Sequence, residues 1–125
     1  MCTENDTILR AIRGATSVET DSSDDICART TELLEEILAR NPVAVDDIVS
    51  ILFTATPDLT ADFPAVAARK LGLAATPLIC CQEIGVQGAM ARCVRVMMHC
   101  YTDREQAVRH VYLHDARQLR TDLPE

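Results

Sequence analysis

The residues with the clearest capacity for chemistry are arginines in apolar surroundings. Arg95 lies in the segment 92–101 (RCVRVMMHCY), which we interpret as a strand rich in Val and Met. A charge in such a strand is costly unless it is paired or lines a cleft, so we expect Arg95 to serve a site. Lys70 is the only lysine among 12 basic residues. The planar guanidinium of arginine suits carboxylate ligands. Codon usage in the host would produce the same preference for arginine over lysine.

The motifs of common catalytic sites are absent from the sequence. A phosphate-binding loop would need Lys-Ser or Lys-Thr after its glycines, but the segment from Gly85 to Gly88 leads into Ala89 and Met90. There is no G-x-S-x-G elbow, no H-E-x-x-H metal motif and no calcium-binding loop. None of the three histidines has a characteristic spacing from Cys80. On motifs alone, the chain would be taken for a binding module.

The six cysteines do not form a recognisable framework. No C-x-x-C is present, and the adjacent pair Cys80–Cys81 suits neither a zinc clip nor an ordinary disulfide. We therefore expect these cysteines to act as small apolar residues in a reducing compartment. Metal binding or redox chemistry is the remaining alternative.

Composition limits the class of protein further. A chain of 125 residues predicts one domain. Its net charge of −7 and its few aromatic residues argue against a nucleic-acid partner, and it has no basic amphipathic segment for a membrane surface. We see no secretory leader and no apolar run of about 20 residues, so we expect a soluble, cytoplasmic protein. With two Phe, two Tyr and no Trp for the core, burial between subunits is plausible.

The chain pattern predicts an α/β or α+β domain with a mixed sheet and one long helix. Strands are expected at 8–18, 48–55, 76–81, 92–101 and 110–113, with a long helix at 21–41 and a short one at 65–71. Asp21, Ser22 or Ser23 can cap the long helix, and Asn41–Pro42 ends it. Its predicted apolar stripe consists of Ile26, Thr30, Leu33, Leu34, Ile37 and Leu38. Glu36 and Arg40 are spaced to pair on its outer face.

Four separated segments carry a family resemblance. They are Ile12-Arg-Gly-Ala-Thr16; Ala55-Thr-Pro-Asp-Leu59 with Phe63-Pro-Ala65; Cys80-Cys-Gln-Glu83 with the segment up to Arg95-Val-Met-Met98; and Arg109-His-Val-Tyr-Leu113 with Leu119-Arg120. In this order and at these distances they resemble the AroH class of chorismate mutase. The similarity covers residues 8–123 as the chorismate mutase domain and leaves 1–7 as a flexible N-terminal extension.

The resemblance implies a homotrimer, a pseudo-α/β barrel, with active sites in clefts between adjacent subunits. It also implies a Claisen rearrangement of chorismate to prephenate, without cofactor or metal, in aromatic amino-acid biosynthesis. The alternative from the same fold is a non-catalytic, carboxylate-binding or regulatory trimer.

The resemblance also assigns site residues. One subunit would supply the catalytic set Arg13, Cys80, Glu83, Arg95 and Tyr112. The neighbour would supply the substrate-binding residues Phe63, Ala65 and Arg69, with Leu119 and Arg120 near the mouth of the cleft. Family members usually have a basic residue where this chain has Val66, and a proline where it has Thr121.

Within that resemblance, each side chain receives a role. Arg95 would stabilise charge on the ether oxygen, and Arg13 and Tyr112 would hold a carboxylate. Glu83 and Cys80 would position the ring hydroxyl, and the apolar wall would come from Phe63, Ala65 and Leu119. Structural alternatives exist for several: an ion pair for Arg13, a solvated charge for Glu83, Arg69 or Arg120, and a core position for Tyr112.

Overall fold

The computed structural model describes residues 6–120. Its elements are β1 (Thr7–Ser17), α1 (Ser23–Arg40), η2 (Val45–Asp47), β2 (Ile48–Ala55), α2 (Ala65–Lys70), β3 (Leu78–Gln82), β4 (Cys93–Asp103), β5 (Val111–Tyr112) and η3 (His114–Leu119). The strands form one sheet in the order β3-β2-β4-β1-β5. Its β1–β4 and β2–β4 pairs are antiparallel and its β1–β5 and β2–β3 pairs are parallel, which confirms the predicted mixed sheet.

Most predicted bounds differ from the observed ones by one or two residues. The differences at β3 and β5 are the most informative. β3 begins at Leu78 rather than at residue 76, after Pro77, which has no N–H to donate although its carbonyl accepts from Ile51 at 3.0 Å. The predicted strand at 110–113 is reduced to two residues and passes directly into η3, which was not predicted. Most of the proposed extension, and Thr121 to residue 123 at the end of the proposed domain, lie outside the described residues.

Helix α1 is defined at both ends by side chains. The hydroxyl of Ser22 accepts from the backbone N of Asp25 at 3.1 Å, so Ser22 is the cap among the three candidates. At the other end the buried amide of Asn41 donates to the carbonyls of Ile37 and Arg109, both at 2.9 Å. Asn41 thereby ties the end of the helix to the segment that leads into β5. The predicted Glu36–Arg40 pair is present at 2.9 Å.

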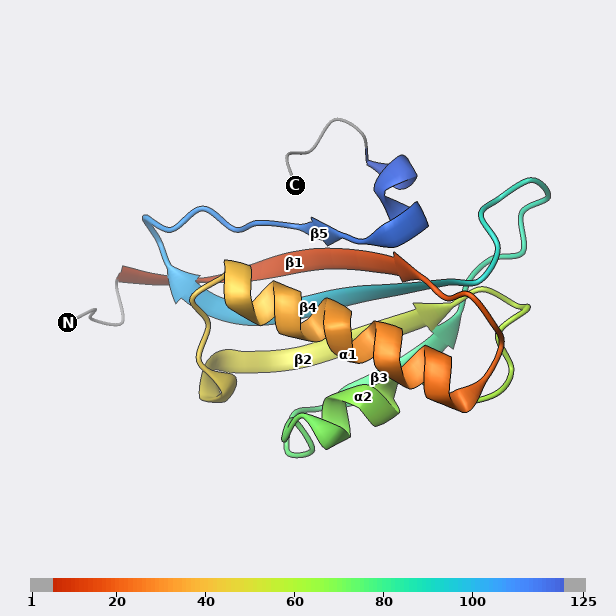
Figure 1. The fold of residues 1–125 in the computed structure, drawn as a ribbon. Coiled ribbons are helices and arrows are strands. Elements are labelled where there is room, and N and C mark those ends of the chain that lie inside the picture. Colours follow the sequence, from red (N-terminus) through yellow and green to blue (C-terminus); the bar gives the residue numbers. More distant parts are fainter. Residues whose placement is uncertain (1–5, 121–125) are drawn as a thin grey trace.

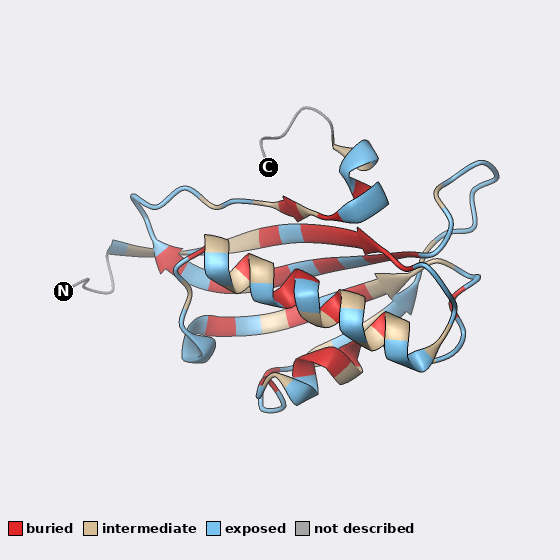
Figure 2. Ribbon diagram, in the orientation of Figure 1, coloured by how far each residue is buried: buried red, intermediate tan, exposed pale blue. Residues whose placement is uncertain are grey.

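Both helices pack on one face of the sheet (Figure 1). The predicted stripe of α1 is buried except for Leu38, which is partly exposed (Figure 2). Ile26 packs in a smaller, separate cluster, whereas Leu33, Leu34 and Ile37 form the main core with β1, β2 and β4. Gly14 permits this contact, because a Cβ there would lie 2.9 Å from Ile37 Cδ1 and 3.2 Å from the Val111 carbonyl oxygen. Gly14 therefore faces α1, and its neighbours Arg13 and Ala15 face the opposite side of the sheet.

The opposite face of the sheet carries exposed apolar side chains. Strand register aligns Ile79, Leu52 and Met97 across β3, β2 and β4, and places Leu9 beside Tyr101. All five are among the exposed large apolar residues. We call Leu9, Leu52, Ile79, Met97 and Tyr101 the open-face patch. Across residues 6–120, no helix has the length and apolar character needed to cross a membrane.

Candidate active site

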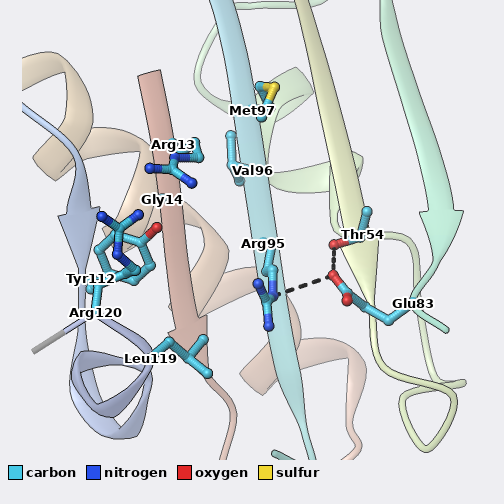
Figure 3. Close-up of a pocket in the computed structure, with 10 residues that line it drawn as sticks. All are labelled: Arg13, Gly14, Thr54, Glu83, Arg95, Val96, Met97, Tyr112, Leu119 and Arg120. Carbon is cyan, nitrogen blue, oxygen red and sulfur yellow. Dashed lines mark hydrogen bonds and ion pairs between the residues drawn. The ribbon is translucent and has the colours of Figure 1, made fainter. Parts of the chain in front are cut away.

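A cavity of about 430 Å³ opens on the same side of the sheet as the open-face patch. Its described lining residues are Arg13, Gly14, Thr54, Glu83, Arg95, Val96, Met97, Tyr112, Leu119 and Arg120 (Figure 3). Most of the residues assigned from the sequence thus come together in one cavity of one chain. They are contributed by β1, β4, β5, the segment after β3, and η3 with its following residue.

Strand register explains how this convergence arises. Arg95 on β4 lies opposite Ala15 on β1 and Thr54 on β2. Ala15 in turn pairs with Tyr112 on β5. Residues in register share a face of the sheet. Arg95 and Tyr112 therefore project to the side that α1 and α2 leave uncovered.

Arg95 is held by a carboxylate at one side of the cavity. Its Nε lies 3.4 Å from Glu83 Oε2, and the Thr54 hydroxyl donates a hydrogen bond to that same oxygen. The backbone N of Glu83 donates to the carbonyl of Ala55 at 2.9 Å, which fixes the chain just beyond β3. The Arg95 side chain is still 49% exposed, against 22% for Glu83. A half-exposed guanidinium oriented by Glu83 can donate further hydrogen bonds to a ligand.

The cavity is electropositive although the whole chain is acidic. Among residues 6–120, its lining contains the guanidinium groups of Arg13, Arg95 and Arg120 and the carboxylate of Glu83, a formal net charge of +2. In Figure 3, Arg13, Tyr112 and Arg120 lie on the β1–β5 side, and Arg95 with Glu83 lies on the β4–β2 side. Charges beyond about 8–10 Å are screened at physiological ionic strength, so these nearby cations determine what the cavity attracts.

His110 supports the backbone at Arg13. Its Nδ1 accepts a hydrogen bond from the backbone N of Arg13 at 2.9 Å, which requires that nitrogen to be unprotonated. Burial lowers the pKa of His110, and the positive charges of Arg13 and Arg120 lower it further. The site therefore favours a neutral imidazole, which keeps this hydrogen bond intact.

The remaining predicted residues lie elsewhere. Cys80 is in register with Phe53 and packs partly against the core, so its side chain faces the helices rather than Arg95. The structure therefore does not bring Cys80 into the cavity with Arg13 and Arg95, in contrast to the grouping expected from the sequence. The cause is the two-residue period of the strand, which turns successive side chains to opposite faces.

Cys80 instead lines a second cavity of about 540 Å³ with Phe63. Phe63 is 66% exposed at its rim, whereas Ala65 at the start of α2 is buried and Arg69 is exposed. We call the second cavity, lined by residues of 55–64 and 80–82, the Phe63 groove.

Cys93 and Cys100 are poorly suited to thiol chemistry. Burial raises the pKa of the thiols of Cys93 and Cys100, although the nearby Arg95 acts in the opposite direction on Cys93. Protonated, buried thiols are poor nucleophiles and poor metal ligands. Among residues 6–120, no group of three or more His, Cys, Asp or Glu is arranged to hold a metal ion.

Sequence reasoning missed four lining residues. Thr54 was interpreted only as part of an apolar strand, although it bonds Glu83. Val96 and Met97 follow Arg95, and Gly14 follows Arg13. Thr54 could have been found only through the register of β2 against β4, which places it opposite Arg95.

The chain is similar to known proteins over most of its length. Residues 9–123 match the family model described as chorismate mutase type I. A chorismate mutase AroH of Bacillus subtilis is 47% identical over 118 residues, covering 93% of each chain. One from Thermus thermophilus is 42% identical over 118 residues, covering 93% of this chain and 97% of that protein. A solved chorismate mutase from Clostridium thermocellum superimposes with a TM-score of 0.84 at 48% identity, covering 87% of this chain and 98% of that one.

Proposed function

This chain belongs to the chorismate mutase type I family, and we propose that the cavity around Arg95 is where it rearranges chorismate to prephenate. The observation that carries this proposal is Arg95, half exposed in an electropositive cavity and oriented by Glu83. The family places the enzyme among the isomerases of aromatic amino-acid biosynthesis. The first experiment is to incubate the purified chain with chorismate in buffer containing a chelator and to identify the product. Formation of prephenate is expected, and its absence would refute the assignment.

The reaction requires no group transfer from the protein. Within one molecule the ether carbon–oxygen bond breaks while a carbon–carbon bond forms, so nucleophile, proton donor and cofactor are all dispensable. Two contributions remain for the protein. It holds the substrate in its compact, reactive conformer, and it stabilises charge that develops along the reaction.

Arg95 serves the second of these contributions. As the ether bond breaks, negative charge grows on the oxygen, and the guanidinium of Arg95 donates to it. Glu83 holds Arg95 by the 3.4 Å contact, and its carboxylate accepts from the ring hydroxyl of the substrate. The Thr54 hydroxyl bound to Glu83 limits the rotation of that carboxylate. The charge-stabilising donor is thereby in place before the reaction begins.

Other lining side chains bind the carboxylates of chorismate. Arg13 and Tyr112 hold one carboxylate from the β1–β5 side of the cavity, and Arg120 lies near the mouth of the cavity. The formal charge of +2 on the described lining residues matches a dianion. Leu119 supplies an apolar surface for the ring.

We further propose that the functional assembly is a homotrimer. The support is the open-face patch, because a row of exposed Leu, Ile, Met and Tyr on a sheet face normally marks an interface. Additional copies of this chain are the proposed occupants. In that packing we expect the Phe63 groove of one subunit to lie towards the Arg95 cavity of the next, so that Phe63, Cys80 and the nearby exposed Arg69 complete the site from the neighbour. The buried Ala65 would support this rim from the start of α2 rather than contact the substrate. Val66 would leave this rim one cation short of the usual family pattern.

Mixing inactive variants tests the shared site. Arg95→Ala damages the cavity and Phe63→Asp damages the groove, so each homotrimer should lose most of its activity. After co-refolding in equal amounts, about one quarter of the sites in random trimers would combine an intact cavity with an intact groove. Activity returning toward that fraction is expected. No recovery in verified mixed trimers would mean that both residues act within one subunit.

Two finer points accompany the proposal. A non-catalytic carboxylate-binding trimer is not favoured, because the relatives matched over 93% of this chain are named as chorismate mutases. Such a binding protein would bind chorismate without forming prephenate.

A cytoplasmic location is supported by five free thiols among residues 6–120, which suit a reducing compartment. They belong to Cys27, Cys80, Cys81, Cys93 and Cys100. Cell fractionation tests this location.

A further inference from the structure

Two lining residues of the cavity depend on the direction of η3. Leu119 is the last residue of this short helix and Arg120 follows it. A six-residue 3₁₀ helix is intrinsically weak, because its hydrogen bonds have poor geometry. Its direction must therefore be set by contacts with the rest of the fold.

Hydrogen bonds from the backbone anchor the beginning of η3 to β1. The backbone N of Leu113 donates to the carbonyl of Ala15 at 2.9 Å, and that of Asp115 donates to the hydroxyl of Ser17 at 3.1 Å. The side chain of Ala116 is buried against Ala15. Leu119 at the end of the helix packs against the same small cluster as Ala116, so a rotation at the start of η3 displaces Leu119 and the adjacent Arg120 together.

His114 occupies the turn from which η3 departs. Its backbone φ is +53°, in the left-handed region that is unfavourable for a residue with a Cβ. Leu113 before it is extended, so the change of direction is concentrated at His114. A conformation of this kind persists only where neighbouring contacts hold it.

The contact at this turn is made by α1, on the other side of the sheet. His114 Nε2 donates to Glu32 Oε1 at 2.7 Å, and both side chains are partly exposed, at 38% and 49%. An exposed pair of this kind contributes little to overall stability. The position of the Glu32–His114 pair is what distinguishes it. The pair connects helix α1 to the residue at which the chain changes direction into η3.

We propose that Glu32 and His114 are positioning residues, which hold Leu119 and Arg120 at the mouth of the cavity. This inference rests on the proposed function, because its kinetic consequence is expressed in the binding of chorismate. Losing the contact lets η3 rotate away and weakens substrate capture. The chemistry at Arg95, which is held separately by Glu83, continues.

The kinetic test compares Glu32→Ala with a matched control on the same helix. Alanine is required because the side-chain oxygen of glutamine could still accept from His114 Nε2. Glu36→Ala is the control, since within residues 6–120 this carboxylate pairs with Arg40 of the same helix. For Glu32→Ala the KM for chorismate should rise about two- to fivefold, the fold-change that corresponds to one exposed side-chain pair. Its kcat should stay close to that of wild type, and Glu36→Ala should change neither constant. An unchanged KM in Glu32→Ala, or a fall in kcat together with melting temperature, would overturn the proposal.

Charge reversal supplies a rescue that general destabilisation would not produce. Glu32→Arg and His114→Glu should each raise the KM, because each places like charges together or removes the pair. The double variant restores an ion pair of opposite polarity and should recover most of the wild-type KM. A double variant with the summed defect of the two single ones would contradict the proposal.

Hydrogen exchange separates this inference from the proposed function. Amides of the segment 115–120 should exchange faster in Glu32→Ala than in wild type or Glu36→Ala, whether or not chorismate is turned over. Faster exchange with no wild-type turnover would sink the proposed function and leave the structural contact supported. Normal turnover with unchanged exchange and KM would sink the positioning role alone.

Discussion

Glu83 Oε2 lies 3.4 Å from Nε of Arg95, so the central cation of the cavity is oriented by a carboxylate while half of its side chain remains accessible. The arrangement separates two tasks. Glu83 sets the direction of the guanidinium, and the donors that remain are available to a substrate. An isolated arginine would first have to lose the freedom of its long side chain.

The pH dependence of folding should report the neutral state of His110. Its pKa is lowered by burial from the ordinary value of 6.5, so the folded protein takes up this proton less readily than the unfolded chain. The associated stability is fully present above 6.5 and is lost as the pH falls from there through the lower folded-state pKa. Urea midpoints measured from about pH 8 to about pH 5 should therefore fall more steeply in wild type than in His110→Asn.

The variant His110→Asn is a matched comparison, because an amide oxygen can accept from the Arg13 N–H without titrating. Parallel pH profiles for the two proteins would show that His110 contributes nothing to the acid sensitivity.

The stability of the fold should be sensitive to the addition of a single methyl group at Gly14. In Gly14→Ala the new Cβ meets Ile37 Cδ1 at 2.9 Å and the Val111 carbonyl oxygen at 3.2 Å. Separating α1 from the sheet to relieve this contact should lower the free energy of unfolding by about 1–3 kcal/mol. Chemical denaturation measures this change in the free energy of unfolding. In Gly85→Ala, where the nearest atom is Pro57 Cγ at 3.6 Å, the change should be small; equal losses in both variants would contradict the packing argument.

The open-face patch should control assembly. Leu52 lies between Ile79 and Met97 in the strand register, so Leu52→Asp places a charge in the middle of the proposed interface. Sedimentation should show a trimer for wild type and smaller species for the variant, with activity lost in parallel. Val45→Asp, at an exposed apolar residue of η2, is the control and should remain trimeric. A Leu52→Asp variant that stays trimeric would place the interface elsewhere.

The helix and the central strands could be predicted because their signals are local. The stripe from Ile26 to Ile37 repeats with helical period, and Ser22 supplies its cap within the same short segment. β2 was recognisable as a nearly continuous apolar run, interrupted by Ser50 and Thr54. η3 escaped prediction because a single buried residue, Ala116, gives no periodicity to detect.

The site was predictable only in part. Arg95 could be singled out because its charge is unexpected in an apolar strand, and Arg13, Glu83 and Tyr112 came from the family resemblance. What the sequence lacked was register: it did not show that Thr54 faces Arg95, or that Cys80 faces the core. The contact between Glu32 and His114 joins residues 82 positions apart and has no local signal at all.

The central claim is that Arg95 stabilises charge on the breaking ether bond, and the steady-state kinetics of Arg95→Lys with chorismate test it most directly. Lysine keeps the positive charge but not the guanidinium fork. The account predicts that kcat falls about 10²–10³-fold, the usual effect of removing one such donor, while the fold and assembly are retained. Arg104→Lys, at an exposed arginine outside the cavity lining, should behave as wild type. Prephenate formation at an undiminished rate in Arg95→Lys would contradict the claim.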